Sequence, residues 1–161
     1  MNLNLVILSL VTLERLLELA LARRNTLRLL GEGAHEHAPG HYPIIVCVHA
    51  LWLASLWWLA PSRPIDGFWL GFFLLLELGR IWVLTTLGRR WTTRIIVLPG
   101  AQLVRQGPYR LVDHPNYWVV IGEIAVLPLV FGLWQISLLF TLLNSAVLAV
   151  RIRKENEALG R

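Results

Sequence analysis

Polar residues that could carry chemistry are concentrated in two short segments late in the chain. The first, DHPNY, spans 113–117 and places a histidine, an amide and a phenol close together. The second, RIRKENEAL, spans 151–159, where Arg151 and Glu155 lie one helical turn apart on a single face. Such side chains bind anionic or hydroxyl groups and move protons. An apolar run separates the segments, so any joint site depends on how that run folds.

The rest of the chain is apolar for a sequence of 161 residues. Hydrophobic residues make up 56% of it and charged residues only 16%. A soluble core does not need this composition, whereas a bilayer with a hydrocarbon core of about 30 Å needs apolar segments of roughly 17–25 residues. Five segments reach or approach that length: 3–22, 43–60, 66–87, 116–131 and 134–150. We therefore expect an all-α integral membrane protein with about five transmembrane helices.

The last two segments are short for a crossing and are expected to form a helical hairpin. Pro115 suits the first turn of a helix, where its missing amide hydrogen costs nothing, and His114 becomes the N-cap. At 1.5 Å per residue, the chain rises about 25 Å from Pro115 to Gly132 and descends as far from Trp134 to Arg151. The hairpin thus returns to its starting height, and the two polar segments should meet there.

Basic residues predict the orientation. Arginines and the lysine follow the first, third and fifth apolar segments, whereas Arg63 alone lies on the opposite side. Because Lys and Arg near span ends mark cytoplasmic loops, we expect an outer N-terminus and a cytoplasmic C-terminus, in the inner membrane if the protein is bacterial. The chain is expected to be one membrane domain, 1–161. Its three-helix part is 1–87, and 88–161 holds a cytoplasmic loop, the hairpin, a C-terminal helix and a cytoplasmic cofactor pocket.

Other binding classes are disfavoured. The net charge of +5 is split among loops, which favours membrane orientation over nucleic-acid binding. The single cysteine, Cys47, is expected to be a packing residue. His35, His37 and His41 lack a regular scaffold, so we expect a flexible, solvated loop rather than a metal site. No obligate protein partner is evident, and the expected partners are membrane lipids and a lipophilic small molecule.

Apart from Asp66 at the very start of one segment, six charged residues fall inside the apolar segments: Glu14, Arg15, Glu18, Glu77, Arg80 and Glu123. Each costs about 2.5–3.5 kcal/mol on insertion scales, so each needs a partner or a function. Glu77 and Arg80 can pair on one helix face, and at least one of Glu14 and Glu18 must find a cation on another helix or at an internal wet cavity. Structural ion pairing is one interpretation of these residues. Glu123 stands apart because it shares a helix side with Asn116 and Tyr117 and could line a site.

The run LVRQGPYRLVDHPNYW, residues 103–118, together with RIRKENEAL, resembles the isoprenylcysteine carboxyl methyltransferase family. Its members are small membrane methyltransferases that use S-adenosylmethionine. In that family a Gly-x-Tyr stretch leads to a basic-His-Pro-x-Tyr motif, a helical hairpin follows, and an Arg-Ile-x-x-Glu-Glu segment closes the site. The stretch GRRWTTRIIVLPG, residues 88–100, is similar to bacterial members, some of which are thought to methylate phenolic lipids.

The resemblance implies a set of residues around S-adenosylmethionine: Gln102, Leu103, Val104, Tyr109, His114, Pro115, Asn116 and Tyr117. It also implies that Glu155 holds the amino group or ribose of this cofactor and that Arg151 faces the acceptor. Asp113 stands in place of the family's basic residue, Asn156 in place of the second glutamate, and Val119 in place of a frequent glycine. The missing cation at position 113 weakens the case for a carboxylate acceptor.

The resemblance implies transfer of a methyl group to an oxygen of a lipophilic substrate, either a carboxylate or a phenol. A carboxylate would need only Arg151 to orient it. A phenol, with an ordinary pKa near 10, would need a base, for which His114 and Glu123 are candidates. Three alternatives remain: a phospholipid-type N-methyltransferase, a sterol-reductase-like enzyme that uses NADPH, and a non-enzymatic membrane protein.

Overall fold

Five long helices carry the fold. The structure, a computed structural model, describes residues 2–160 apart from the side chain of His41. The helices are α1 (Leu3–Gly31), α2 (Tyr42–Leu59), α3 (Gly67–Leu87), α4 (Pro115–Val130) and α5 (Trp134–Leu159). The prediction of an all-α fold is confirmed, and each apolar segment corresponds to one helix.

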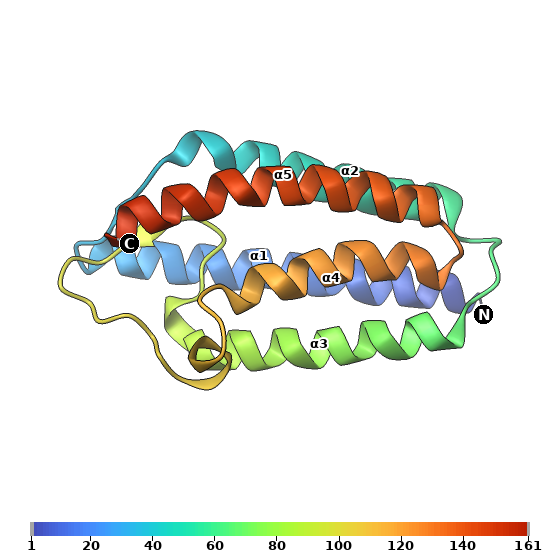
Figure 1. Cartoon of the computed structure of the whole chain (residues 1–161), viewed down its shortest axis with the longest axis horizontal. Coiled ribbons are helices and arrows are strands. Elements are labelled where there is room, and N and C mark those ends of the chain that lie inside the picture. Colours follow the sequence, from blue (N-terminus) through green and yellow to red (C-terminus); the bar gives the residue numbers. More distant parts are fainter. Residues whose placement is uncertain (1, 161) are drawn as a thin grey trace.

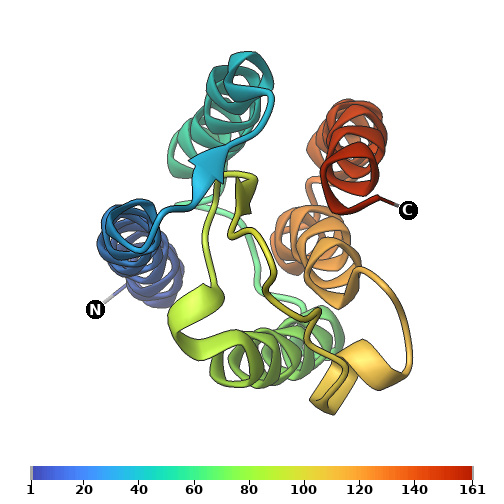
Figure 2. The same ribbon diagram turned by 90° about the vertical axis from the view of Figure 1, so that its left-hand side faces the viewer.

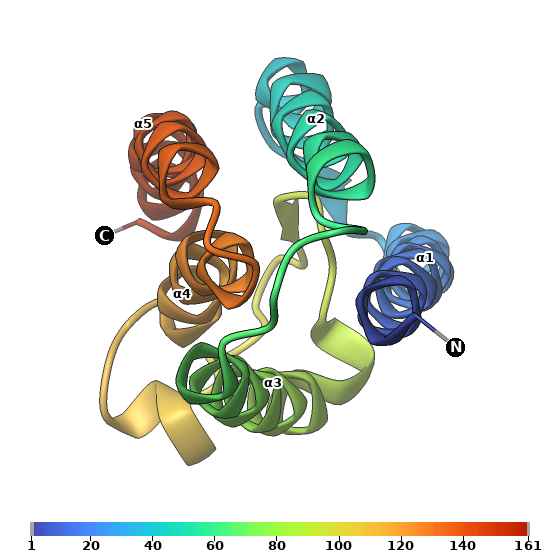
Figure 3. The ribbon, with the colours of Figure 1, turned by 90° about the vertical axis from the view of Figure 1, so that its right-hand side faces the viewer.

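Successive helices run in opposite directions, so α1 begins at one end of the bundle and α5 ends at the other (Figure 1). Seen along the bundle, the helices follow the order α1, α3, α4, α5, α2 around a ring (Figure 3). The predicted hairpin is formed by α4 and α5, which pack along each other and are joined at Phe131 and Gly132. The start of α4 and the end of α5 therefore lie at the same end of the bundle.

Three of the helices are long and apolar enough to cross a membrane: Tyr42–Leu59, Gly67–Arg90 and Trp134–Leu159. The apolar helix α4 has only 16 residues. Helix α1 continues to Gly31 and α5 to Leu159, past the predicted ends at 22 and 150. Hydropathy marks only the apolar part of a helix, whereas the Arg, Glu and Leu residues that follow are good helix formers.

The distribution of polarity is the reverse of that in a water-soluble bundle. Large apolar side chains cover the outside, among them Leu10, Leu74, Leu78 and Leu142, each more than half exposed. Several polar or charged side chains are buried inside: Asn4, Asn25, Arg80, Glu123, Ser137, Asn144 and Arg151. This arrangement suits a bilayer, where charge is expensive on the lipid face. Cys47 lies on the exposed face of α2, so its expected role in packing is wrong.

Helices α3 and α4 approach closely through two glycines. A Cβ added at Gly122 would lie 2.9 Å from a methyl carbon of Leu76, which is too close for an unshifted structure. On the facing helix, a Cβ at Gly79 would lie 3.5 Å from Val119. Val119, where the family often has a glycine, therefore packs against α3. At this contact the glycine is Gly79, which belongs to α3 rather than to α4.

The connection between α3 and α4 closes one end of the bundle (Figure 2). It contains the short helices η2 (Gly88–Arg90) and η3 (Gly107–Arg110) and the strand β2 (Ile96–Val97). The strand β1 (His35–Glu36) pairs with β2 in antiparallel register, and the short helix η1 (Pro39–His41) follows it. Part of the histidine-rich loop, predicted to be flexible, is thus held by backbone hydrogen bonds.

Candidate active site

The hairpin brings the two polar segments together. His114 immediately precedes α4, and its Nδ1 lies 4.0 Å from Oε2 of Glu155 on α5. Its Nε2 lies 3.1 Å from Oδ1 of Asn156, and its ring stacks on Tyr117 with centroids 5.4 Å apart. The predicted meeting of these segments is confirmed. We call His114, Tyr117, Arg151 and Glu155 the hairpin site.

Tyr117 is the centre of the hairpin site. Its hydroxyl donates to Oε2 of Glu155 and accepts a hydrogen bond of 2.7 Å from Nε of Arg151. Nη1 of Arg151 donates at 2.7 Å to the carbonyl oxygen of Thr93 in the α3–α4 connection. Tyr117 and Arg151 are each only 7% exposed. The network thus ties α4, α5 and the connection together and fixes the orientation of the guanidinium.

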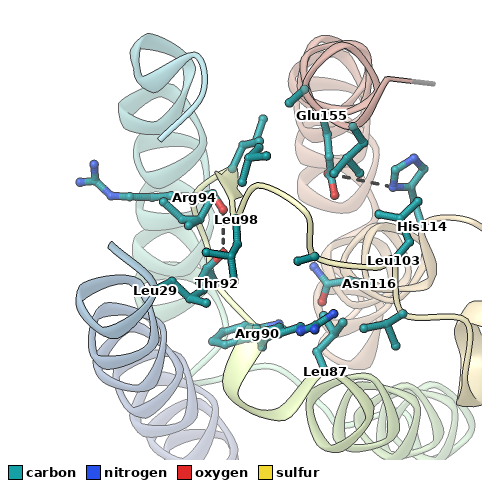
Figure 4. A pocket seen from close by; sticks show the side chains of 18 of the residues that line it. Leu29, Leu87, Arg90, Thr92, Arg94, Leu98, Leu103, His114, Asn116 and Glu155 are labelled. Carbon is teal, nitrogen blue, oxygen red and sulfur yellow. Dashed lines mark hydrogen bonds and ion pairs between the residues drawn. The ribbon is translucent and has the colours of Figure 1, made fainter. Parts of the chain in front are cut away.

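A cavity of about 380 Å³ opens beside the hairpin site. Figure 4 shows Glu155 and His114 at one side of it, with Asn116 and Leu103 nearby. Of the residues predicted to surround the cofactor, these line the cavity: Gln102, Leu103, Val104, Tyr109, His114, Asn116, Tyr117 and Glu155. Pro115 does not, because it is buried in the first turn of α4 and shapes the start of that helix.

Two buried polar atoms in the cavity lining lack hydrogen-bond partners within the described part of the chain. They are Oδ1 of Asn116, an acceptor, and Nε1 of Trp91, a donor. Oε1 of Glu155 likewise accepts no hydrogen bond from any described side chain. Buried polar groups in proteins are nearly always paired, so the atoms of Asn116 and Trp91 are suited to a polar ligand. The partly exposed Glu155 offers a further acceptor beside them.

The α3–α4 connection forms a wall of this cavity and is anchored at several points. Nη1 of Arg90 donates at 2.7 Å to the carbonyl oxygen of Gln102. Gly107 has φ +53°, and an added Cβ there would lie 2.5 Å from Oγ1 of Thr86, so the tight approach of η3 to α3 requires glycine. Burial, and secondarily the charge of Glu155, raise the pKa of Tyr109. Tyr109 therefore keeps its hydroxyl proton at neutral pH and can donate it to a ligand.

A second cavity, of about 300 Å³, lies deeper between α1, α2, α4 and α5. Its lining is largely apolar, with side chains such as Leu16, Leu19, Leu53 and Leu148. Five residues line both cavities: Trp91, Thr92, Asn116, Tyr117 and Arg151. The two cavities therefore meet across a shared wall that includes part of the hairpin site. The second cavity was not predicted from the sequence. The sequence signal for it is His49, a histidine within an apolar helix.

The charged residues of the apolar segments form a separate cluster between α1, α3 and α4. Arg80 donates to both carboxylate oxygens of Glu123, and its Nη1 lies 3.0 Å from Glu18. Arg15 lies 2.9 Å from Glu18, 3.2 Å from Glu123 and 3.4 Å from Glu77. We call these five residues the interhelix ion network. The expected partner of Glu18 on another helix is confirmed.

Two expectations about this network need correction. Glu77 and Arg80 were expected to pair, but Arg80 instead meets carboxylates of α1 and α4, and Glu77 meets Arg15. The neighbouring helices offer Arg80 two carboxylates at once, which a single residue of its own helix cannot match. Glu123, a candidate base, lies in neither cavity lining and is 2% exposed, with both oxygens engaged by arginines.

Comparison with known proteins decides the family. Residues 69–161 match the model of the isoprenylcysteine carboxyl methyltransferase family. The chain belongs to this family. Members are methyltransferases of membranes, so this isoprenylcysteine carboxyl methyltransferase relative is a membrane methyltransferase acting on a lipophilic substrate. The match begins near the start of α3 and so covers the connection, the hairpin and both polar segments.

Two relatives of this methyltransferase support the assignment. An uncharacterized protein of Bacillus subtilis, YpbQ, is 38% identical over 159 residues, which cover 96% of this chain and 95% of YpbQ. An uncharacterized protein of Haemophilus influenzae is 31% identical over 90 residues, or 55% of this chain and 47% of that protein. No solved structure matches the chain. The similarity to YpbQ extends over the N-terminal helices.

Proposed function

We propose that the protein transfers a methyl group from S-adenosylmethionine to an oxygen of a lipophilic acceptor. One observation carries this proposal: a cavity at the bundle end that contains polar groups and a more apolar cavity between the helices share a wall of five residues. A water-soluble donor and a lipid-soluble acceptor can thus approach a single point from different sides. Family membership supports methyl transfer as the reaction.

The first cavity has the donor set that S-adenosylmethionine needs. Glu155, with its Oε1 unengaged by described side chains, is suited to an ammonium group or to ribose hydroxyls. Oδ1 of Asn116 offers a second acceptor, and the hydroxyl of Tyr109 offers a donor. The bound cofactor supplies an electrophilic methyl group on a positively charged sulfur. The chain's part is to hold this group beside the shared wall.

The second cavity suits the lipophilic acceptor. Its leucines would bury an aliphatic chain, at about 25 cal/mol for each Å² removed from water. Arg151, fixed by Tyr117 and Thr93, would orient the accepting oxygen at the shared wall. Alignment of this kind can contribute about 7–11 kcal/mol to a reaction between two bound partners. An apolar cavity also excludes water, which strengthens the electrostatic attraction between an anionic oxygen and a cationic methyl donor.

The predicted catalytic residues take unequal parts in this proposal. Arg151 lies in both cavity linings and is the residue that faces the acceptor. His114 lies only in the first lining, stacked on Tyr117 and bound to Asn156, so it helps to shape the cofactor site. Glu123 holds α4 to α1 and α3 through arginines and takes no direct part. If the acceptor is a hydroxyl group, its proton therefore needs another base.

The membrane arrangement is part of the proposal. We infer five crossings, in which the short helix α4 is sheltered by its neighbours, and an outer N-terminus. The start of α1 and the end of α5 lie at opposite ends of the bundle, which is consistent with an odd number of crossings (Figure 1). The polar cavity would then face the cytoplasm, where S-adenosylmethionine is made. The basic residues that follow α1, α3 and α5 favour the same orientation.

Transfer of a labelled methyl group tests the proposal. The purified protein is incubated with S-adenosylmethionine carrying a labelled methyl group and with lipid extracts, and the label is followed into lipid-soluble products. We expect label in an ether or ester and expect Arg151→Ala to abolish it. Label in an amine would instead establish a phospholipid N-methyltransferase. Binding of NADPH by a sample that does not bind S-adenosylmethionine would establish a reductase.

A further inference from the structure

His49 is a histidine inside the apolar helix α2 and lines the second cavity. Its Nδ1 lies 2.8 Å from the carbonyl oxygen of Ile45, one turn earlier on the same helix. A carbonyl oxygen only accepts hydrogen bonds, so Nδ1 must carry the proton. In the neutral ring, Nε2 then holds a lone pair. None of the side chains that the structure describes hydrogen-bonds Nε2, which leaves it free to accept a proton.

The other ionisable side chains of the second cavity are already engaged. Arg15 and Arg80 bind carboxylates of the interhelix ion network. Glu18 is one of these carboxylates and contacts both arginines. Arg151 is held by Tyr117 and by Thr93. The charges that act on His49 are Arg15, Arg80 and Glu123, which are of both signs. The Nε2 atom is therefore the one strong proton acceptor that the described residues leave available in this cavity.

Trp91 supplies a second, independent sign of a polar ligand. It is 4% exposed, its Nε1 has no partner among the described residues, and it lines both cavities. A buried indole N–H normally finds an acceptor. An oxygen of a bound acceptor would satisfy this donor. Negative charge that develops on that oxygen would be stabilised by the same hydrogen bond.

We propose that His49 is the catalytic base when the methyl acceptor is a hydroxyl compound such as a phenol. This inference rests on the proposed function and adds to it the residue that would take the acceptor's proton. A carboxylate is already ionised at neutral pH, so it has no proton for the lone pair of His49 to accept. A phenol keeps its proton at neutral pH and needs a base in contact with its oxygen.

The reaction balances with His49 as proton acceptor. The acceptor hydroxyl gives its proton to Nε2, and the oxygen forms a bond to the methyl carbon. The bond between that carbon and sulfur breaks, and its electron pair stays on sulfur. The products are a methyl ether, a neutral thioether and an imidazolium at His49. The imidazolium then returns its proton to water once the product has left the cavity.

Two acceptors of different acidity test the role of His49. The probes are meta-pentadecylphenol and a nitro-substituted analogue whose hydroxyl ionises near neutral pH. In His49→Gln we expect the rate with the ordinary phenol to fall about 100-fold or more, the range for loss of a general base. The rate with the nitrophenol should change far less, because that probe already provides the anion. An equal loss with both phenols would overturn the proposal.

A binding measurement without cofactor gives a separate readout. The absorbance of the nitrophenol reports how much of the bound probe is ionised. Wild-type protein should increase the ionised fraction of the probe relative to His49→Gln at the same pH. His35→Gln, a change at an exposed histidine outside both cavity linings, is the matched control and should behave as wild type. An unchanged spectrum in His49→Gln would contradict a proton transfer to this ring.

The same samples separate failure of this inference from failure of the proposed function. Binding of S-adenosylhomocysteine to His49→Gln shows that the variant is folded. Trp91→Phe, which keeps the aromatic ring and removes the N–H, should slow methylation of the ordinary phenol as well. If wild type methylates the phenol and His49→Gln does so equally fast, only the base assignment is wrong. If wild type neither binds the cofactor product nor methylates any probe, the proposed function itself is wrong.

Discussion

Two groups of charged residues lie in this bundle, and they differ in what their side chains leave unpaired. In the interhelix ion network, the guanidinium groups of Arg15 and Arg80 bind carboxylates from three helices, and Glu123 is 2% exposed. In the hairpin site, Glu155 faces a cavity of about 380 Å³, next to the unpaired oxygen of Asn116. The first group is closed in the sense that its charges pair with one another, although Arg15, Glu18 and Arg80 also border the second cavity. The second group leaves acceptor atoms open to a ligand.

Charge inside a membrane helix does not by itself indicate catalysis. Glu123 and Arg151 are both buried and charged, and both were candidate catalytic residues. What separates them is whether a cavity adjoins the charged group. The partners of Glu123 come from helices packed directly against it, whereas Arg151 lies at the wall that two cavities share.

Breaking the closed network should have the largest effect on stability. Arg80→Met leaves Glu123 and Glu18 with less positive charge inside the bundle, and removal of one partner from a buried ion pair costs about 3–5 kcal/mol. We expect a clear loss of unfolding free energy in detergent. Arg89→Met, at an exposed arginine just past α3, is the control. Recovery in Arg80→Met with Glu123→Leu would sharpen the assignment, and unchanged stability in Arg80→Met would refute it.

Changing the open site should affect turnover more than stability. In Arg151→Lys, one ammonium replaces a guanidinium that binds Tyr117 and the Thr93 carbonyl through two different nitrogens. Hydrogen bonds to charged groups contribute about 1.5–3 kcal/mol, so we expect methyl transfer to fall about 10- to 100-fold. Cofactor affinity should change little. Arg153→Lys on the same helix is exposed and serves as control, and equal rates in both variants would contradict the role of Arg151.

A smaller effect should appear at high pH. The pKa of Tyr109 is raised by burial and by Glu155, so the folded chain holds this proton when the unfolded chain has lost it. The resulting stability is complete below the ordinary tyrosine pKa near 10 and is lost as pH rises through the folded value. Titration of tyrosinate absorbance should show a late-titrating amplitude that falls by one tyrosine in Tyr109→Phe. An equal late amplitude in both proteins would be inconsistent with burial beside Glu155.

Much of the fold followed from local sequence. The lengths of the apolar runs located all five helices, and Pro115 marked the start of α4 correctly. The helical rise predicted the meeting of His114 with Glu155 because two antiparallel helices of similar length return to one height. The motifs near 113–117 and 151–159 lie in this part of the chain, and eight of the predicted cofactor residues line one cavity.

The sequence could not predict what depends on packing between distant helices. The partners of Arg80 follow from which faces of α1, α3 and α4 turn inward, and spacing along α3 alone suggested Glu77 instead. The second cavity arises where side chains of several helices fail to fill the space between them. His49 becomes a candidate functional residue only because it lines that cavity. No local pattern distinguished it from a histidine bound to its own helix.

Calorimetric titration with S-adenosylhomocysteine tests the central claim, that the hairpin ends form the cofactor site. Three samples are compared in detergent: wild type, Glu155→Ala and Glu157→Ala. Glu157 lies on the same helix, is exposed, and binds only Lys154 among the described residues. We predict binding by wild type and Glu157→Ala, with affinity reduced at least about tenfold in Glu155→Ala. Equal affinity in all three, or none in folded wild type, would contradict the account.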